Sequence, residues 1–204
     1  MLWCLKKVST IRRMSVVLIF LLSWYAVGQL HLLDTNDVLP TVRKVMDSKK
    51  LHKLGTSYTE GFVAHAVLRM SEHVDLQAEV SAIQESYQEY ADGKDPKYDR
   101  CVDNLAFGCS LFDLYRITED DKWLAAAKKC SDYQINNLKS KNGIDSLLGC
   151  TRFWVDDMAM IGVLQSSAYR ATNEQIYADW LGREMNAYVE NEIHRDSGLF
   201  WHTK

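Results

Sequence analysis

The sequence predicts an all-α protein assembled from helical hairpins. The chain has 204 residues, of which 47% are hydrophobic and 25% charged, as in ordinary packed domains. It contains only two prolines and ten glycines, whereas a β-sandwich needs a turn signal about every 8–12 residues. Apolar residues recur at spacings of three and four along most of the chain, which is the period of an amphipathic helix. These three observations favour helices over strands.

Five segments with this helical period follow one another between Asp34 and Leu138. They are expected over Asp34–Leu54, Tyr58–Met70, Val74–Tyr90, Asp103–Tyr115 and Asp120–Leu138. A polar, glycine-containing loop is expected from Lys139 to Gly149. The next helix is expected to begin at the paired acids Asp156 and Asp157.

An internal repeat relates three pairs of these helices. Each pair is joined at an arginine followed two positions later by a hydroxyl residue: Arg69 and Ser71, Arg116 and Thr118, Arg170 and Thr172. A glycine stands ten positions before each hydroxyl, at Gly61, Gly108 and Gly162. We therefore expect αα-hairpins whose inner helix is thinned by glycine for close packing and whose outer helix is started by a hydroxyl cap. Such hairpins stack as an open solenoid or as a closed α/α toroid.

The repeat also predicts where polar side chains gather. In the last two copies an aspartate, Asp103 or Asp157, lies fifteen positions before the hydroxyl. Asp103 and the pair Asp156 and Asp157 would then fall at the same end of the stacked hairpins. Two acids at a helix start behind Trp154 suit a site at that end, but they also suit simple capping, since Asp is a favoured N-cap and acids complement the helix dipole. Spacing alone leaves both interpretations open.

The N-terminus has the pattern of a secretory signal. Four basic residues and no acid precede Asp34, and an apolar run follows from Val16 to Leu22 and continues to Val27. Small residues near Gly28 make cleavage after that residue plausible, which leaves residues 29–204 as the mature chain. The run is short for a membrane span, so we expect an exported protein, periplasmic or extracellular, with an uncleaved anchor or initiation at Met14 as the alternatives.

Charge and cysteine content narrow the function classes. The formal net charge is −3, and removal of residues 1–28, with four basic residues and no acid, makes it −7. This balance predicts no nucleic-acid partner, and an acidic substrate must be met by local groups. Cys101, Cys109, Cys130 and Cys150 fit no metal motif, and we expect buried thiols rather than disulfides. Neither a metal nor another cofactor is predicted.

Several runs of residues together resemble one enzyme family. They are Tyr98–Gly108, Leu111–Thr118, Phe153–Met160, Ala168–Thr172 and Gly198–His202, and they occur in this order from about Ser57 to the end of the chain. They look like the unsaturated uronyl hydrolases of glycoside hydrolase families 88 and 105, closer to the rhamnogalacturonyl type. The resemblance implies a six-hairpin α/α toroid.

The resemblance also implies a substrate and a reaction. Lyases that degrade pectin or related polysaccharides leave a sugar with a C4=C5 double bond, and the family hydrates that bond so that the glycosidic linkage falls. One acid/base carboxyl suffices for this chemistry, so the paired carboxylates of ordinary glycosidases are not required. The expected partner is therefore an unsaturated oligosaccharide, while the sequence does not set the oligomeric state.

Site residues follow from the matching motifs. The resemblance makes Asp156 the catalytic acid/base, with Asp157 as the alternative or as the cap, and Asp103 the second acid, which contacts the uronate ring. His202, Trp154 and Asp157 are expected to contact substrate.

The resemblance is to part of the family fold. The family has about twice the helical content found here, so residues 29–204 are expected to form a partial toroid with an exposed apolar edge. The alternative function is a truncated, non-catalytic α-hairpin module that binds carbohydrate or protein.

Overall fold

The structure is a computed structural model, and it describes most of the chain from Lys53 onward. The described residues are 40, 43–44, 53–96, 102–141, 144–147, 154–192 and 196–200. The chain divides into two units, Met1–Val45 and Met46–Lys204. Of the first unit only Pro40, Arg43 and Lys44 are described, and they are helical, as expected for the first helix. The predicted signal segment, residues 1–28, lies outside the described residues.

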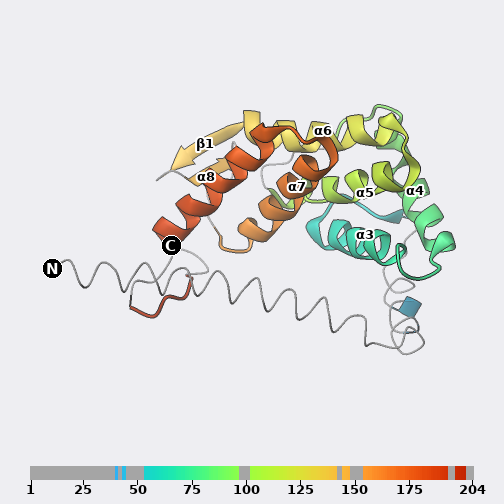
Figure 1. Cartoon of the computed structure of the whole chain (residues 1–204), viewed down its shortest axis with the longest axis horizontal. Helices are drawn as coiled ribbons and strands as arrows, with labels where there is room; N and C mark the ends of the chain where they lie inside the picture. Colours follow the sequence, from blue (N-terminus) through green and yellow to red (C-terminus); the bar gives the residue numbers. More distant parts are fainter. Residues whose placement is uncertain are drawn as a thin grey trace. The chain divides into compact units, whose positions relative to one another are not determined.

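Three helical hairpins make up the described part of the second unit (Figure 1). The pairs are α3 (Tyr58–Met70) with α4 (Gln77–Ala91), α5 (Gly108–Thr118) with α6 (Asp121–Asn136), and α7 (Asp157–Thr172) with α8 (Gln175–Glu192). A short 3₁₀ helix, η2 (Val102–Asn104), precedes α5. Helix α5 packs against α3 on one side and α7 on the other, while α4 contacts α6. The three first helices therefore form an inner row, and the repeat found in the sequence is a repeat of structure.

The helix boundaries agree with the prediction except where a turn interrupts the helical period. Helix α3 covers the predicted segment, and α4 begins at Gln77, three residues later than predicted, because Asp75 Oδ1 accepts from the Gln77 N–H at 3.3 Å. The segment predicted as one helix from Asp103 is split into η2 and α5. Its break lies at Leu105, whose carbonyl accepts the Gly108 N–H at 2.9 Å in a turn.

The hydroxyl residues of the repeat end the inner helices, so the expected role as caps of the outer helices is wrong. Thr118 Oγ1 donates to the Leu114 carbonyl and Thr172 Oγ1 to the Ala168 carbonyl, both at 2.8 Å. Helix α6 is capped instead by Asp120, whose carboxylate accepts from the Lys122 N–H at 3.0 Å. The same two hydroxyls accept the N–H groups of Asp120 at 3.3 Å and Glu174 at 3.1 Å, which precede the outer helices, so they close the connections without capping the first turns of those helices.

A β-hairpin stands where a loop was expected. Strands β1 (Leu138–Lys141) and β2 (Ile144–Leu147) pair antiparallel, with Lys141 opposite Ile144. The two intervening residues in the sequence are Asn142 and Gly143, the pair most typical of a two-residue hairpin turn. The polar composition concealed this signal. The all-α prediction holds apart from this hairpin, which follows α6 and precedes α7 along the chain.

Close packing, as predicted, occurs at two of the repeated glycines, while no described atom packs closely at the third. A Cβ on Gly61 would lie 2.6 Å from the Phe107 Cα, and one on Gly108 would lie 2.7 Å from the Cys130 Cβ. A Cβ on Gly162 would meet no described atom within 4 Å. The close approach at Gly61 seats Phe107 in the core, where its ring centroid lies 5.5 Å from that of Tyr87.

Cys109 and Cys130 are buried free thiols, as expected, and burial raises the pKa of both. Cys101 and Cys150 lie outside the described residues. Within the part of the chain that the structure describes, no helix is both long and apolar enough to cross a membrane.

Candidate active site

The first turn of α7 carries the paired acids. The Asp157 N–H donates to the Trp154 carbonyl at 3.0 Å, and the Trp154 N–H donates to Asp157 Oδ2 at 3.3 Å. The two residues therefore close the turn in both directions, and the Asp157 carboxylate reaches back to a backbone N–H three residues earlier, as the acid of a capping box does. Asp157 is 4% exposed and Trp154 is half-buried. Asp157 thus has a structural contact at the start of α7.

Asp156 lies inside this turn and is the N-cap residue of α7. Its carbonyl accepts the N–H of Ala159 at 3.0 Å and, more weakly, that of Met160 at 3.5 Å. Its side chain makes no capping hydrogen bond to the described first turn of the helix, and the residue is half-buried. Simple capping, which the sequence left open for both acids, therefore describes Asp157 and not Asp156.

Asp103 approaches from the neighbouring hairpin. It lies in η2, immediately before α5, and is half-buried. The turn that holds it is closed by the N–H groups of Leu105 and Ala106, which both donate to the Val102 carbonyl. Because η2 packs against α7, the segments that carry Asp103 and the aspartate pair are brought together, as the repeat predicted.

The C-terminal motif is described only in part. His202 lies outside the described residues, so its expected contact with substrate stays a prediction. Leu199 and Phe200 in the same motif are 70% and 39% exposed, and Gly198 adopts a positive φ of 70°. Glycine adopts a left-handed backbone conformation without steric cost, which explains why the motif carries a glycine at this position.

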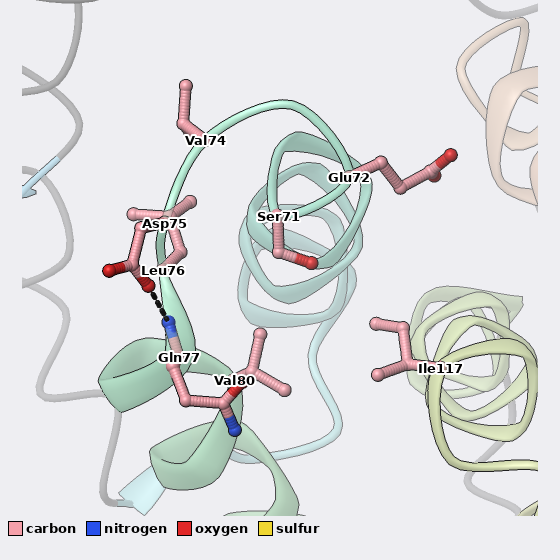
Figure 2. Close-up of a pocket in the computed structure, with 8 residues that line it drawn as sticks. All are labelled: Ser71, Glu72, Val74, Asp75, Leu76, Gln77, Val80 and Ile117. Atoms are coloured by element: carbon pink, nitrogen blue, oxygen red, sulfur yellow. Dashed lines mark hydrogen bonds between the residues drawn. The ribbon is translucent and has the colours of Figure 1, made fainter.

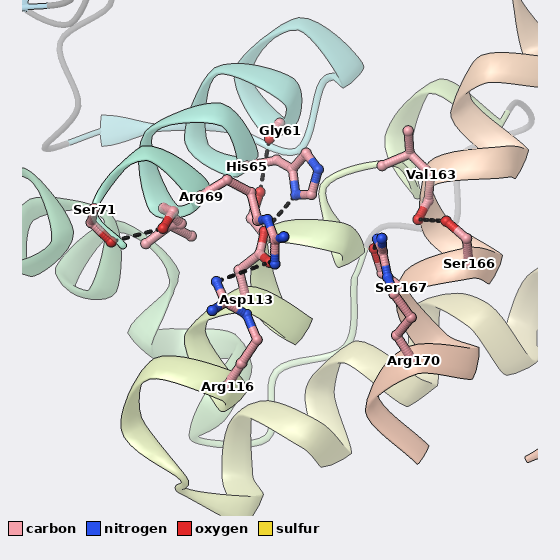
Figure 3. A network of polar contacts seen from close by, with 12 residues as sticks. Gly61, His65, Arg69, Ser71, Asp113, Arg116, Val163, Ser166, Ser167 and Arg170 are labelled. Carbon is pink, nitrogen blue, oxygen red and sulfur yellow. Dashed lines mark hydrogen bonds and ion pairs between the residues drawn. The ribbon is translucent and has the colours of Figure 1, made fainter. Parts of the chain in front are cut away.

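Sequence reasoning missed a polar network between α3 and α5. Asp113, with a side chain only 7% exposed, pairs with His65 and lies 3.9 Å from Arg69 and 3.6 Å from Arg116 (Figure 3). Glu72 accepts from the same two arginines at 3.2 and 2.8 Å. The sequence marks the arginines through the repeat, and an acid three positions from each of them, Glu72 or Asp113, is the local signal for ion pairs.

A small pocket lies at the opposite end of α5 from η2. It has a volume of about 190 Å³ and lies between the α3–α4 connection, the start of α4 and the end of α5 (Figure 2). Ile117, 37% exposed, forms its α5 side. Its acids are already bonded, Glu72 to arginines and Asp75 to the Gln77 N–H. The pocket is therefore separate from the candidate active site.

No group of three or more His, Cys, Asp or Glu residues that could hold a metal ion occurs among the described residues. The aspartates at η2 and α7 can, however, exchange protons with a bound ligand, because carboxyl groups serve as general acids and bases. The arrangement suits proton transfer by one carboxyl with a second carboxyl nearby.

Comparison with known families matches residues 34–204 to Glycosyl Hydrolase Family 88. No curated protein matches the chain. Among solved structures, the chain is similar to an unsaturated glucuronyl hydrolase from Streptococcus agalactiae, with 21% identity and a TM-score of 0.55 over 73% of this chain.

Two further solved structures are similar in fold. One is a family GH76 α-mannanase of Bacteroides thetaiotaomicron, with 16% identity and a TM-score of 0.56 over 71% of this chain. The other is a polysaccharide lyase, with 14% identity and a TM-score of 0.56 over 80% of this chain. The chain covers 39%, 47% and 51% of the lengths of these three structures. The likeness confirms the predicted fold, helical hairpins of the α/α-toroid kind.

Proposed function

Because the chain belongs to glycosyl hydrolase family 88, we propose that it hydrolyses unsaturated uronyl oligosaccharides by hydrating the C4=C5 double bond of the terminal sugar. The observation that carries the proposal is the family match over residues 34–204. The first turn of α7 adds support, since it presents one acid, Asp156, beside a second acid with a structural contact. Products of pectin lyases or related lyases are the proposed substrate class.

The proposed reaction needs one proton donor that later acts as a base. Asp156 in its acid form gives its proton to C4 of the double bond, and positive charge develops at C5. A water molecule then adds to C5 while the Asp156 carboxylate takes up a proton from it. The resulting hemiketal opens and releases the remaining sugar, so the glycosidic bond is broken without direct attack on the anomeric carbon.

The other predicted residues take supporting roles. Asp103 is proposed to contact the uronate ring from η2, which packs against α7. Trp154, which is half-buried, and His202 are proposed to contact the substrate. Asp157 Oδ2 holds the turn by accepting from the Trp154 N–H, and its contact with substrate stays a prediction.

The test is the loss of ultraviolet absorbance when the conjugated double bond of an unsaturated disaccharide is hydrated. Asp156→Asn keeps shape and hydrogen bonding but cannot cycle a proton, so turnover should fall by about 10²–10⁴-fold while substrate binding, measured by calorimetry, remains. Asp103→Asn should weaken binding as well as rate. The matched control is Asp75→Asn, an exposed aspartate at the other end of the hairpins. Full turnover in Asp156→Asn would refute the proposal.

A second candidate function is a non-catalytic module that binds carbohydrate. It is favoured by one observation, that Asp157 at the start of α7 holds the turn through the Trp154 N–H, a use of the paired acids that needs no catalysis. The same calorimetry separates the two candidates. Binding of the unsaturated disaccharide with no loss of absorbance supports the module, and turnover supports the hydrolase.

We also propose that the protein is exported, on the basic and apolar pattern of residues 1–28. Mass spectrometry of the protein recovered from the producing cells should find a mature chain that begins near Gln29. Recovery of an intact Met1 in exported material would contradict cleavage at that site.

A further inference from the structure

The two adjacent aspartates of α7 stand in different environments. Asp157 is 4% exposed, and its Oδ2 accepts from the Trp154 N–H at 3.3 Å. Asp156, one residue earlier, is half-buried and makes no capping bond to its own helix. Burial of a charged carboxylate is costly unless hydrogen bonds compensate it, so a buried Asp157 points to a specific structural use.

The turn that contains Asp156 is closed at both of its ends by the same two residues. Trp154 supplies the carbonyl that accepts the Asp157 N–H at 3.0 Å, and Asp157 supplies the carboxylate that accepts the Trp154 N–H. Asp156 lies between them with helical backbone angles, φ −69° and ψ −24°. Its Cα–Cβ direction is therefore set by a turn that Asp157 holds.

Two other helices of the fold, α3 and α6, are capped by the side chain of the N-cap residue itself. Ser57, the N-cap of α3, accepts the Glu60 N–H with its own side chain, and Asp120, the N-cap of α6, accepts the Lys122 N–H. In those helices the N-cap side chain is used to hold the backbone. In α7 the next residue, Asp157, holds the backbone by accepting from the Trp154 N–H, while the carboxylate of the N-cap residue Asp156 makes no capping hydrogen bond.

We propose that Asp157 is a positioning residue for the reaction, and that its hydrogen bond to the Trp154 N–H fixes the turn from which Asp156 delivers its proton. This inference rests on the proposed function of Asp156. Loss of the hydrogen bond lets the turn relax, and a displacement of about 1 Å at a catalytic group can cost about 10²-fold in rate. The effect should appear in kcat, because the bound substrate is unchanged while the acid is misplaced.

The decisive comparison is between two substitutions of the same residue. In Asp157→Asn the amide oxygen can still accept from the Trp154 N–H, so kcat should stay within a few-fold of the wild-type value. In Asp157→Ala the acceptor is absent, and kcat should fall by about 10²-fold with KM little changed. Asp120→Ala is the matched control, because it removes the cap of α6 and should leave kcat unchanged.

A second measurement reads the turn directly and needs no turnover. Amide hydrogen exchange at Trp154 should be slow in the wild type and in Asp157→Asn, and fast in Asp157→Ala. If Asp157→Asn abolishes turnover as fully as Asp156→Asn does, Asp157 transfers the proton itself and the inference is overturned. If Asp157→Ala keeps normal kcat or slow exchange at Trp154, the inference is also overturned.

Failure of the proposed function would look different from failure of this inference. If Asp156→Asn keeps full turnover, or the wild type binds without turnover, the assignment of Asp156 is wrong and Asp157 positions no catalytic acid. The exchange data then still report whether Asp157 holds the turn. Normal turnover in Asp157→Asn with a large loss in both Asp156→Asn and Asp157→Ala supports both proposals together.

Discussion

The two junctions between neighbouring hairpins differ in the polar contacts of their inner helices. Outer-layer contacts occur at the first junction too, because Lys129 of α6 donates to the Gly93 carbonyl at 3.2 Å and to Asp95 at 2.8 Å. Between the first and second hairpins, polar contacts join inner helix to inner helix: Ser110 Oγ donates to the Gly61 carbonyl at 2.8 Å, and Asp113 of α5 pairs with His65 of α3. Between the second and third hairpins, the described polar contacts come from the outer helix α6. Gln165 of α7 donates to Gln134 at 2.7 Å, and Lys128 donates to the Tyr177 hydroxyl at 2.7 Å.

The polar contacts that join α7 to the second hairpin thus come from the outer layer, whereas the packing of α7 also involves α5 of the inner row. Gln165 is fully buried and bonds to Gln134 of α6. Leu164 packs closely against α5, since a Cβ on Gly108 would lie 2.8 Å from its Cδ1. Around Gly162, on another face of α7, a Cβ would meet no described atom within 4 Å. Among the described residues, α7 is therefore closely packed around Leu164 and Gln165 and has space around Gly162.

The largest expected effect breaks the first junction at Asp113. Asp113→Asn removes a buried carboxylate that faces His65, Arg69 and Arg116, and we expect a loss of about 2–3 kcal/mol in the free energy of unfolding. The arginines are 44% and 38% exposed, so water screens part of the loss. Urea denaturation measures the change.

The matched control for Asp113 is the equivalent residue of α7, Ser167. Its hydroxyl accepts only a long bond from Arg170, at 3.4 Å, among the contacts of the described residues (Figure 3). Ser167→Ala should cost less than about 1 kcal/mol. Equal losses at the two positions would show that the inner-helix network does not distinguish the junctions.

The next effect concerns the repeated glycines. Gly61→Ala drives a methyl group to 2.6 Å from the Phe107 Cα, which is backbone and cannot swing away, so overpacking should cost about 1–3 kcal/mol. Gly162→Ala is the control on the open face, and the better helix propensity of alanine should stabilise the protein by up to about 1 kcal/mol. Thermal melts of both variants give opposite signs if the junctions differ as described. Destabilisation by both would contradict the open face at α7.

Much of the fold could be predicted because the repeat and the helical period are local patterns. The bounds of α3 were predicted, and three hairpins followed from the spacing of arginine, glycine and hydroxyl residues. The same pattern could not show which backbone group each hydroxyl would bind, because a carbonyl four residues back competes with the next helix. The β-hairpin was missed although Asn142 and Gly143 signalled it.

The candidate site was predictable in position but not in the division of roles. The sequence places Asp156 and Asp157 at a helix start, and the repeat places Asp103 at the same end. The backbone register of one turn decides which of the two acids bonds to the Trp154 N–H and which is the N-cap residue. A shift of the helix start by one residue would exchange these two roles. The Asp113 network depends on how α3 packs against α5, which no local pattern records.

The second junction can be tested by alkaline unfolding. Burial, and then a 2.6 Å hydrogen bond to Asp132, raise the pKa of Tyr177 to about 12 from the ordinary tyrosine value of about 10. Below pH 10 both states keep the proton, and the contribution to stability is complete. From pH 10 to 12 only the unfolded state loses it, so stability should fall with rising pH, by about 1–2 kcal/mol.

Tyr177→Phe supplies the comparison for this pH dependence. The variant has no phenol to titrate, so the decline of the melting temperature between pH 10 and 12 should become shallower, while its stability at pH 7 drops because the bonds to Asp132 and Lys128 are lost. Unchanged steepness would mean that the contact between α6 and α8 does not contribute to alkaline stability.

The smallest effect compares the two connections that end the inner helices. Glu119 after α5 and Asn173 after α7 both adopt left-handed backbone angles, φ 56° and φ 57°. Their N–H groups donate at 2.7 Å to the backbone carbonyls of Tyr115 and Tyr169, respectively. Asparagine tolerates this region better than glutamate, and glycine adopts it freely. Glu119→Gly should therefore stabilise the protein by about 0.5–1 kcal/mol, and Asn173→Gly by less. Thermal melts of the two variants decide the order; a larger gain at Asn173 would show that the third hairpin strains its connection more than the second does.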